Sequence, residues 1–280
     1  MANSRVIKNR IRTVQNTGKI TKTMAMVSTA KAVKVVTVIK KSRPYAQRLN
    51  KILDTLGAGT DVHPLLKENP DATRKLLIVF TANRGLCGGF NANTIKIAKA
   101  NTDENTDVFM FGKKGIGSFK FAKMPVLKEN TELKDLPLFE HAKDLANEVM
   151  EMYLSGKYSE VSVVYTQYLS AGSQKTTVEK VLPFSIEESE KNETSLIEPL
   201  FNPNKAKLLS GLIPKVVRVS FFRFLLDSAA SEHLARQMAM NSAAENAKDM
   251  VKSLTLSYNR ARQAQITTEI AEIVGGAEAL

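Results

Sequence analysis

The sequence predicts an α/β body inserted between two long N- and C-terminal helices that pair as an antiparallel coiled coil. The first observation is the segment Lys215–Val274, sixty residues without Gly or Pro, which Pro214 precedes and Gly275 follows. Such a segment is typical of one uninterrupted helix. At about 1.5 Å per residue it would be about 90 Å long, whereas a body of about 150 residues has a radius of gyration near 15 Å. The helix must therefore extend beyond its own body, and its apolar stripe needs a companion.

The N-terminal segment is the predicted companion. Residues 4–56 contain one Gly, Gly18, and one Pro, Pro44, at which we expect a bend. Apolar residues recur at steps of three and four, which indicates a helix with a narrow stripe. The stripe comprises Ile7, Ile11, Val14, Ile20, Met24, Val27, Val35 and Val38. At roughly 75 Å this helix would match the C-terminal one in length, so antiparallel pairing lets each cover the other's stripe.

The segment between the two helices predicts the α/β body. The apolar run at 75–83 is typical of a buried strand and leads into the turn-rich segment RGLCGGFN. Further strands are expected at 107–112, 160–170 and 174–184, and helices at 92–100, 113–122 and 138–154. Because strands and helices alternate, we expect a mostly parallel sheet.

The connection to the C-terminal helix is less regular. Residues 185–214 are rich in Glu, Ser, Asn and Pro, with a short helix expected near 205–209. The segment VVRVSFFRF at 216–224 suits a strand, but its apolar residues also keep helical spacing, so periodicity leaves both open. Beyond it the stripe continues through Leu234, Met238, Ala244, Ala247, Val251, Leu254, Tyr258 and Ala261. The predicted domains are an N-terminal shaft helix at 1–58, the body and connection at 59–203, and a C-terminal shaft helix at 204–280.

Composition excludes several classes of protein. With 280 residues and 43% apolar residues, the chain can form one good core or two modest ones. No apolar run approaches the roughly 18 residues that a bilayer span requires. The single cysteine, Cys87, excludes an intrachain disulfide. The N-terminal segment MANSRVIKNR has no apolar signal core, so we expect the protein to stay in the cytoplasm.

The net charge of +12 is concentrated at the N-terminus. Thirteen Lys or Arg residues and no acidic residue occur before Asp54. A solvated face does not explain so uneven a distribution. Two interpretations stay open: a basic rod-shaped protein that binds nucleic acid, and a basic helix that contacts an acidic protein partner. The absence of aromatic residues before Tyr45 counts against nucleic acid.

The residues that could carry chemistry do not form a recognisable enzyme site. The cluster of Gly85, Leu86, Cys87, Gly88 and Gly89 follows a strand, but it lacks the GxGxxG spacing, and no Gly-Lys-Ser/Thr occurs in the chain. We interpret it as a tight turn packed against a neighbouring protein. The three histidines, at positions 63, 141 and 233, lie too far apart in sequence to suggest a metal site. No catalytic, cofactor-binding or metal-binding residue is predicted.

Three segments resemble the gamma subunit of F-type ATP synthases. They are IKNRIRTVQNTGKITKTMAMVSTAK at 7–31, ANRGLCGGFN at 82–91, and the final segment from Ala230 to Leu280. Their order and spacing match those of the family, and together they span the chain. The resemblance implies a non-catalytic rotor: the paired helices form a shaft inside the hexamer of alpha and beta subunits, which holds the nucleotides. It also implies that 216–224 is helical.

The resemblance assigns contacts with the alpha/beta head to particular residues. Met24 matches a family position close to the beta levers, where an apolar side chain is required. The basic face would look toward the acidic lever segments, the polar positions of RQAQITTEI would engage the head, and the last apolar residues would turn within a bearing. These residues are Lys8, Lys19, Lys22 and Lys31 on the basic face, Arg262, Gln263, Thr267 and Glu269 at the polar positions, and Ile273, Val274, Ala277 and Leu280 at the tip.

The resemblance also implies partners and location. The expected partners are alpha and beta subunits, three of each to one copy of this chain, the epsilon subunit and the membrane-embedded proteolipid ring, with no nucleic acid and no small-molecule substrate. The chain would couple ion flow through the membrane sector to conformational change at the catalytic head. We expect it at the cytoplasmic face of a bacterial plasma (inner) membrane, bound peripherally.

Overall fold

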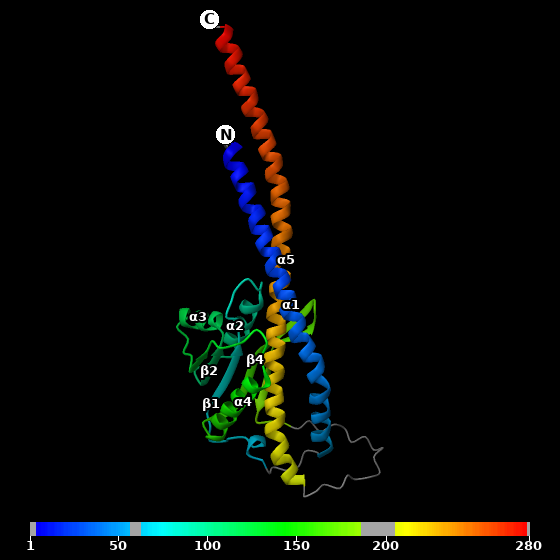
Figure 1. The fold of residues 1–280 in the computed structure, drawn as a ribbon. Helices are drawn as coiled ribbons and strands as arrows, with labels where there is room; N and C mark the ends of the chain where they lie inside the picture. Colours follow the sequence, from blue (N-terminus) through cyan, green and yellow to red (C-terminus); the bar gives the residue numbers. More distant parts are fainter. Residues whose placement is uncertain (1–3, 57–62, 186–204, 279–280) are drawn as a thin grey trace. The chain divides into compact units, whose positions relative to one another are not determined.

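The computed structural model describes residues 4–56, 63–185 and 205–278 (Figure 1). The chain divides into two compact units. One, the helical unit, combines the residues up to Ser28 with those from Arg236 onward, and the other, the body unit, runs from Thr29 to Ala235. The expected domain boundaries at 58/59 and 203/204 lie outside the described residues, as does Leu280.

The body unit contains one five-stranded sheet in the order β3-β2-β1-β4-β5. The strands are β1 (Arg74–Phe80), β2 (Thr106–Phe111), β3 (Lys128–Asn130), β4 (Tyr158–Ser170) and β5 (Ser173–Leu182). The pairs β1–β2, β1–β4 and β2–β3 are parallel, and β4–β5 is antiparallel, which confirms the mostly parallel sheet. Strand β3 was not predicted, because its three residues, Lys-Glu-Asn, are polar and short.

Helices cover both faces of the sheet. They are α2 (Phe90–Ala100), α3 (Lys113–Phe121), α4 (Phe139–Leu154) and the short 3₁₀ helix η1 (Pro64–Leu66). Because successive side chains of a strand point to opposite faces, Leu77 and Val79 of β1 join the core beneath α2 and α3. Leu76, Ile78 and Phe80 join the larger core beneath α4 and the C-terminal helix. Strand β1 is therefore buried on both faces, as its continuous apolar run predicted.

Two long helices account for the rest of the described chain: α1 (Ser4–Leu56) and α5 (Lys205–Glu278). Helix α5 includes 216–224, which resolves that segment as helix, and it continues through Pro214 and Gly275, where we expected it to begin and end. A proline removes one backbone hydrogen bond, but Ile213, Val216 and Val217 on either side are buried in the core, and this packing holds the helix together. A glycine costs about 1 kcal/mol in a helix, which does not stop one.

Within each unit, α1 and α5 run antiparallel and pack together (Figure 1). In the body unit, Val35 and Ile39 of α1 cluster with Leu226 and Ala230 of α5. In the helical unit the helices approach closely, since a Cβ added to Gly18 would lie 3.2 Å from the Cβ of Ala247. This confirms the paired helices.

The stripe of α1 differs in detail from the predicted one. Ile20 and Val27 were expected in it, but their side chains are 60% and 50% exposed. Ala25 and Ser28 are buried in their stead. Small residues at the contact allow the two helices to approach as closely as they do at Gly18. Glycine and serine are not apolar residues, so a search for apolar periodicity does not find such positions.

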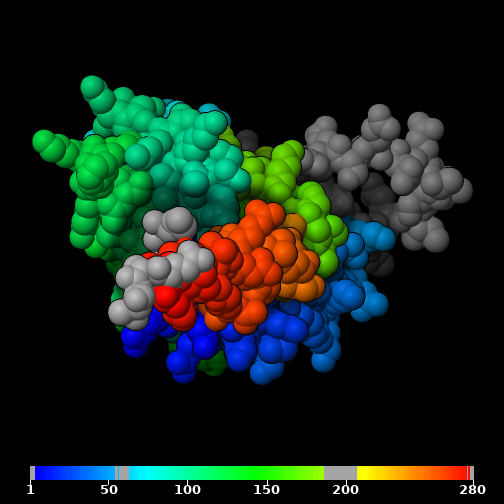
Figure 2. Space-filling model, turned by 90° about the horizontal axis from the view of Figure 1, so that it is seen from above, coloured from blue at the N-terminus to red at the C-terminus, as the bar shows by residue number. Residues whose placement is uncertain are grey.

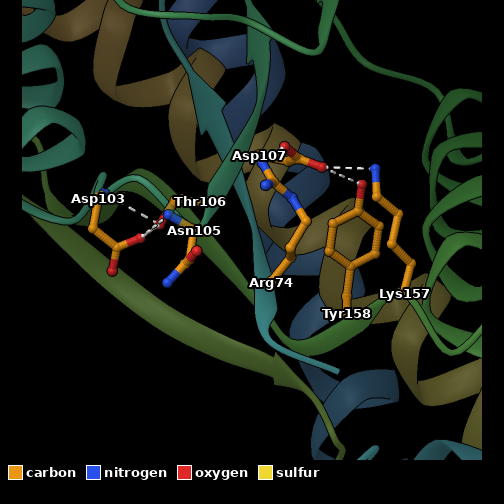
Figure 3. A network of polar contacts seen from close by, with 7 residues as sticks. All are labelled: Arg74, Asp103, Asn105, Thr106, Asp107, Lys157 and Tyr158. Atoms are coloured by element: carbon orange, nitrogen blue, oxygen red, sulfur yellow. Dashed lines mark hydrogen bonds and ion pairs between the residues drawn. The ribbon is translucent and has the colours of Figure 1, made fainter. Parts of the chain in front are cut away.

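The amino ends of β1, β2 and β4 are joined by one polar network (Figure 3). Asp107 of β2 forms an ion pair with Arg74 of β1, and it accepts hydrogen bonds of 2.8 Å from Lys157 Nζ and from the Tyr158 hydroxyl. Partial burial opposes ionisation of Asp107, but these three donors outweigh it and lower its pKa to about 2. Nearby, Asp103 Oδ1 accepts from the backbone N–H of Asn105 at 3.0 Å, which closes the turn before β2.

Candidate functional site

The carboxyl ends of parallel strands are where α/β sheets usually bind ligands, so the loop after β1 is the first place to examine. The side chain of Asn83 organises this loop. Its Nδ2 donates to the Thr131 carbonyl at 2.8 Å, and its Oδ1 accepts from the backbone N–H of Lys113 at 3.1 Å. One asparagine thus fixes the loop after β1, the start of α3 and the loop after β3 relative to one another.

The turn between β2 and α3 requires glycine. Gly112 has φ +91°, and a Cβ there would lie 2.1 Å from the Thr81 carbonyl oxygen. The Thr81 hydroxyl is within 2.9 Å of the backbone N of Gly115, whose N–H donates to it. The N–H groups of Lys113 and Gly115 at the start of α3 therefore already have partners, so this terminus is not arranged to hold a phosphate.

The glycine cluster at 85–89 has one exposed point. Leu86 is 60% exposed and adopts φ +62°, a left-handed conformation that is costly for a residue with a branched side chain. Cys87 beside it is buried, and with Ala82 and Phe90 it forms a small cluster against Ala235 of α5. The loop after β1 is therefore packed against α5 of its own chain.

A polar cavity of about 490 Å³ lies beside this loop. Its lining mixes three basic residues with two acidic ones, and no single charge dominates. The residues are Asn83, Arg84, Lys113, Thr131, Leu133, Lys134, Asp135, Ala229, Glu232 and His233. Over the described ranges, no group of three or more His, Cys, Asp or Glu side chains is placed to hold a metal ion.

The predicted contact residues of α1 differ in their surroundings. Lys8, Lys19 and Lys22 are exposed, and Met24 is half-buried. Lys31 is engaged within its own chain, because its Nζ lies 2.7 Å from Asp135 Oδ2. A groove of about 820 Å³ lies between α1 and α5 in the helical unit, and Lys19 and Lys22 border it together with two lysines of α5. Its lining residues are Val14, Gln15, Gly18, Lys19, Lys22, Asn241, Ala244, Glu245, Ala247, Lys248, Val251 and Lys252.

The predicted contact residues of α5 are open to solvent. Most of the expected stripe is covered as far as Ala261: Leu234 and Ala247 are buried, and the rest are half-buried except Met238, which is 50% exposed and was wrongly assigned to it. Every residue from Arg262 to Gly275 is exposed. Ile273 and Val274 are 72% and 51% exposed. Figure 1 shows the red end of α5 extending past the N-terminal end of α1, and Figure 2 views α5 from this end. The predicted polar positions all have exposed side chains: Arg262, Gln263, Thr267 and Glu269. Two of them form hydrogen bonds within the helix. The Thr267 hydroxyl donates to the Gln263 carbonyl at 3.0 Å, and Glu269 Oε1 accepts from Gln265 Nε2 at 2.9 Å.

Some polar residues were missed by sequence reasoning. Asp135 and His233 meet through a contact that spans 98 residues of sequence, so no local pattern indicates it. Asp227 was also missed; it lies on the buried face of α5 and is 5% exposed. Its position four residues after Arg223 on a helix with buried apolar neighbours is the one signal that the sequence contains.

The fold and the exposed surfaces define a class of protein that combines an α/β body with a long antiparallel helix pair, whose exposed apolar end is suited to a partner. The chain matches the family model described as ATP synthase over residues 3–280. It is 41% identical to the ATP synthase gamma chain of Leptospira biflexa over 288 residues and 42% identical to that of Desulfitobacterium hafniense over 285 residues, with all of each chain covered. The chain belongs to the ATP synthase gamma-chain family.

Solved structures support the same fold. A chain of the Euglena gracilis mitochondrial ATP synthase, in a structure of OSCP/F1/c-ring in rotational state 3, has a TM-score of 0.72 and 22% identity, covering 99% of this chain and 94% of that one. A chain of the Tetrahymena thermophila central stalk and c-ring has a TM-score of 0.57 and 21% identity, covering 80% of this chain and 99% of that one.

Family membership confirms the prediction from sequence resemblance. As a gamma chain, the protein is a non-catalytic subunit of ATP synthase, and the alternative of a nucleic-acid-binding rod is not supported. None of the helices in residues 4–56, 63–185 and 205–278 combines the length and apolar character that a bilayer span needs.

Proposed function

We propose that this chain is the central-stalk rotor of a rotary ATP synthase, coupling ion flow through the membrane sector to conformational change in the alpha/beta head. The observation that carries the proposal is the last part of α5. From Arg262 to Gly275 its side chains are exposed, and they include Ile266, Ile270, Ile273 and Val274. Apolar side chains that their own chain leaves uncovered mark a surface that a partner covers. A partner that encloses the end of the helix would cover the apolar side chains on all of its faces.

The head contacts follow from this arrangement. The polar positions Arg262, Gln263, Thr267 and Glu269 would bind the head about one to three turns before the apolar tip of Ile273, Val274 and Ala277. Lys8, Lys19 and Lys22 would face acidic segments of beta, with Met24 close to them, and Lys31 was expected to join them. Opposite charges on two surfaces mainly accelerate and orient their association. The stoichiometry in this proposal is three alpha and three beta to one copy of this chain.

The body unit supplies further contact points. Leu86, which is exposed and held at φ +62°, is the prominent residue of the interface loop formed by Gly85, Leu86, Cys87, Gly88 and Gly89. A strained exposed residue on a rigid loop is a common feature of binding sites. In this proposal the loop contacts beta or epsilon. The epsilon subunit and the proteolipid ring are the partners at the membrane side, which would place the chain peripherally at the cytoplasmic face of a bacterial plasma membrane.

The test is co-assembly. Purified alone, the chain should hydrolyse no ATP; mixed with alpha and beta subunits, it should form a 1:3:3 complex that does. A variant lacking residues 271–280 keeps most of the helix pair and should assemble more weakly, with a rise in Kd of at least about 100-fold, since losing two buried apolar side chains costs about 3 kcal/mol or more. Size-exclusion chromatography with mass determination, run over a range of chain concentrations, measures the stoichiometry of the complex and the weaker assembly of the variant. Failure of the full chain to assemble would refute the proposed function.

A further inference from the structure

The loop between β3 and α4, residues 131–138, is fixed to the body at both ends. At its start, Asn83 Nδ2 donates to the Thr131 carbonyl at 2.8 Å. At its end, the backbone N–H of Leu138 donates to His141 Nδ1 at 3.1 Å. Pro137, next to Leu138, is buried. The loop therefore holds a defined position on the sheet body, and its middle residues are presented from a rigid base.

The middle of this loop contacts both long helices. The Asp135 carboxylate accepts a hydrogen bond of 2.7 Å from Lys31 Nζ on α1, and the Asp135 carbonyl oxygen lies 3.1 Å from His233 Nε2 on α5. The next residue, Leu136, packs against the cluster that α1 and α5 form through Val35 and Leu226. One residue thus binds α1 through its side chain and α5 through its backbone.

The two contacts differ in character. The His233 side chain is 2% exposed, so its hydrogen bond is shielded from water, and a carbonyl acceptor requires the imidazole proton on Nε2. The Lys31–Asp135 pair is open, with 34% and 54% of the side chains exposed. The hydrogen bond from Lys31 lowers the pKa of Asp135 in spite of partial burial, with further lowering from the charges of His233 and Arg84. An exposed pair contributes at most about 1 kcal/mol, so the shielded contact to His233 is the firmer of the two and the Lys31 pair adds a weaker link to α1.

The location of these contacts along the chain gives them a role. Lys31 lies three residues after Ser28, the last residue of α1 in the helical unit, and His233 lies three residues before Arg236, where α5 enters that unit. The loop therefore holds each helix within one turn of the boundary between the units. We propose that the Asp135 loop is a clamp that fixes α1 and α5 to the sheet within the body unit, and that it transmits torque between the sheet and these two helices. The transmission step rests on the proposed function.

The clamp itself can be tested in the isolated full-length chain. Asp135→Ala and Lys31→Ala should each raise amide hydrogen exchange across residues 29–38 roughly two- to fivefold, the range that the loss of an exposed ion pair allows. Exchange in α2 should not change. The double variant Lys31→Ala with Asp135→Ala should match the single ones. The variant in which the two charges are swapped, Lys31→Asp with Asp135→Lys, is called the exchanged pair and should restore protection. Matched controls are Glu132→Ala on the same loop and Lys34→Ala one turn along α1, both exposed residues.

Transmission is tested in the assembled synthase by the number of coupling ions pumped per ATP hydrolysed. This ratio should fall in Lys31→Ala and Asp135→Ala, recover in the exchanged pair, and stay at the wild-type value in both controls. Faster amide exchange with an unchanged ratio would overturn the torque role, and unchanged exchange would overturn the clamp. If the wild-type chain fails to assemble, the proposed function fails, whereas the exchange measurements still decide whether the clamp exists.

Discussion

The two halves of α5 have the same helical backbone but very different surroundings. In the body unit, Phe221 and Phe224 are fully buried among strands and helices of their own chain. In the helical unit, Leu256 and Ile273 are 62% and 72% exposed. The residues from 262 onward are mostly Ala, Glu, Gln, Arg, Ile and Thr, several of which are good helix formers, with side-chain hydrogen bonds such as Gln265 to Glu269 at 2.9 Å.

This difference separates two ways of holding a helix. The first half is held by tertiary packing, which supplies most helical stability in proteins. The second half has a narrow seam against α1 up to Ala261. Beyond it, the Ser4 hydroxyl of α1 donates to Gln265 Oε1 at 2.8 Å, and other side-chain hydrogen bonds are local to the helix. Substitutions in the first half should therefore affect the free chain, whereas those in the second should affect the complex with its partners.

The largest expected effect is that of Phe224→Ala. The ring of Phe224 packs against Tyr165 with centroids 4.6 Å apart and against Phe221 at 5.8 Å, and the Arg223 guanidinium lies 4.9 Å from its centroid. Truncating so buried an aromatic side chain should lower the free energy of unfolding by about 3–5 kcal/mol. Urea unfolding followed by circular dichroism measures this.

The matched variant in the second half is Leu256→Ala. It removes an exposed apolar side chain from the same helix, so the free energy of unfolding should change by no more than about 0.5 kcal/mol. If the two variants lost similar stability, the contrast between the halves would be wrong, because the second half would then depend on packing as much as the first.

A smaller effect is expected at Asp227, the buried carboxylate of the first half. Burial raises its pKa to about 6, although the charges of Arg223 and Arg43 oppose the rise and that of Glu179 adds to it. Because the folded pKa lies above the unfolded value near 3.8, the folded state binds the extra proton between these values. The stability that Asp227 contributes is therefore fully present below about pH 3.8 and is lost as the pH rises through about 6. At pH 7.5 the buried charge costs on the order of 2–3 kcal/mol.

Asp227→Asn should remove most of that cost. The variant should be more stable than the wild type by about 2 kcal/mol at pH 7.5, and the difference should shrink toward zero by about pH 4. Urea unfolding at a series of pH values gives both quantities. Asp249→Asn, at an exposed position of the second half that pairs with Lys252 at 3.0 Å, is the control and should be nearly neutral. Lower stability of Asp227→Asn at pH 7.5 would mean that the attraction to the two arginines exceeds the cost of burial.

The long helices could be predicted from sequence because their signals are local. Periodic apolar residues identified α1, the absence of Gly and Pro over sixty residues identified α5, and the buried run identified β1. Positions that depend on contact between distant segments could not be found in this way. Gly18 and Ser28 form part of the seam because the helices approach closely there, while Ile20 was assigned to it by spacing alone.

The candidate contact residues were predicted through family resemblance, and they stay predictions. The structure adds where each one lies. Lys8, Lys19 and Lys22 are available to a partner, whereas Lys31 is bound to Asp135, a partner that no sequence spacing indicates. A lysine in a basic run looks the same in sequence whether it binds another protein or its own chain, so only the fold distinguishes the two.

The smallest expected effect on the free chain is that of Ile273→Ser in the exposed half. Its side chain contacts little of its own chain, so the free energy of unfolding should change by no more than about 0.5 kcal/mol. In the complex the side chain should be covered by the head, and losing about 1.5–3 kcal/mol of apolar burial should raise the Kd for alpha and beta subunits roughly 10- to 100-fold. Titration of the labelled chain into the two subunits measures this. Glu272→Ser, at the neighbouring exposed position, controls for changes in helix propensity. Equal affinity of the Ile273→Ser variant and the wild type would mean that the head does not enclose this end of α5, because an enclosed isoleucine cannot be exchanged for serine without loss.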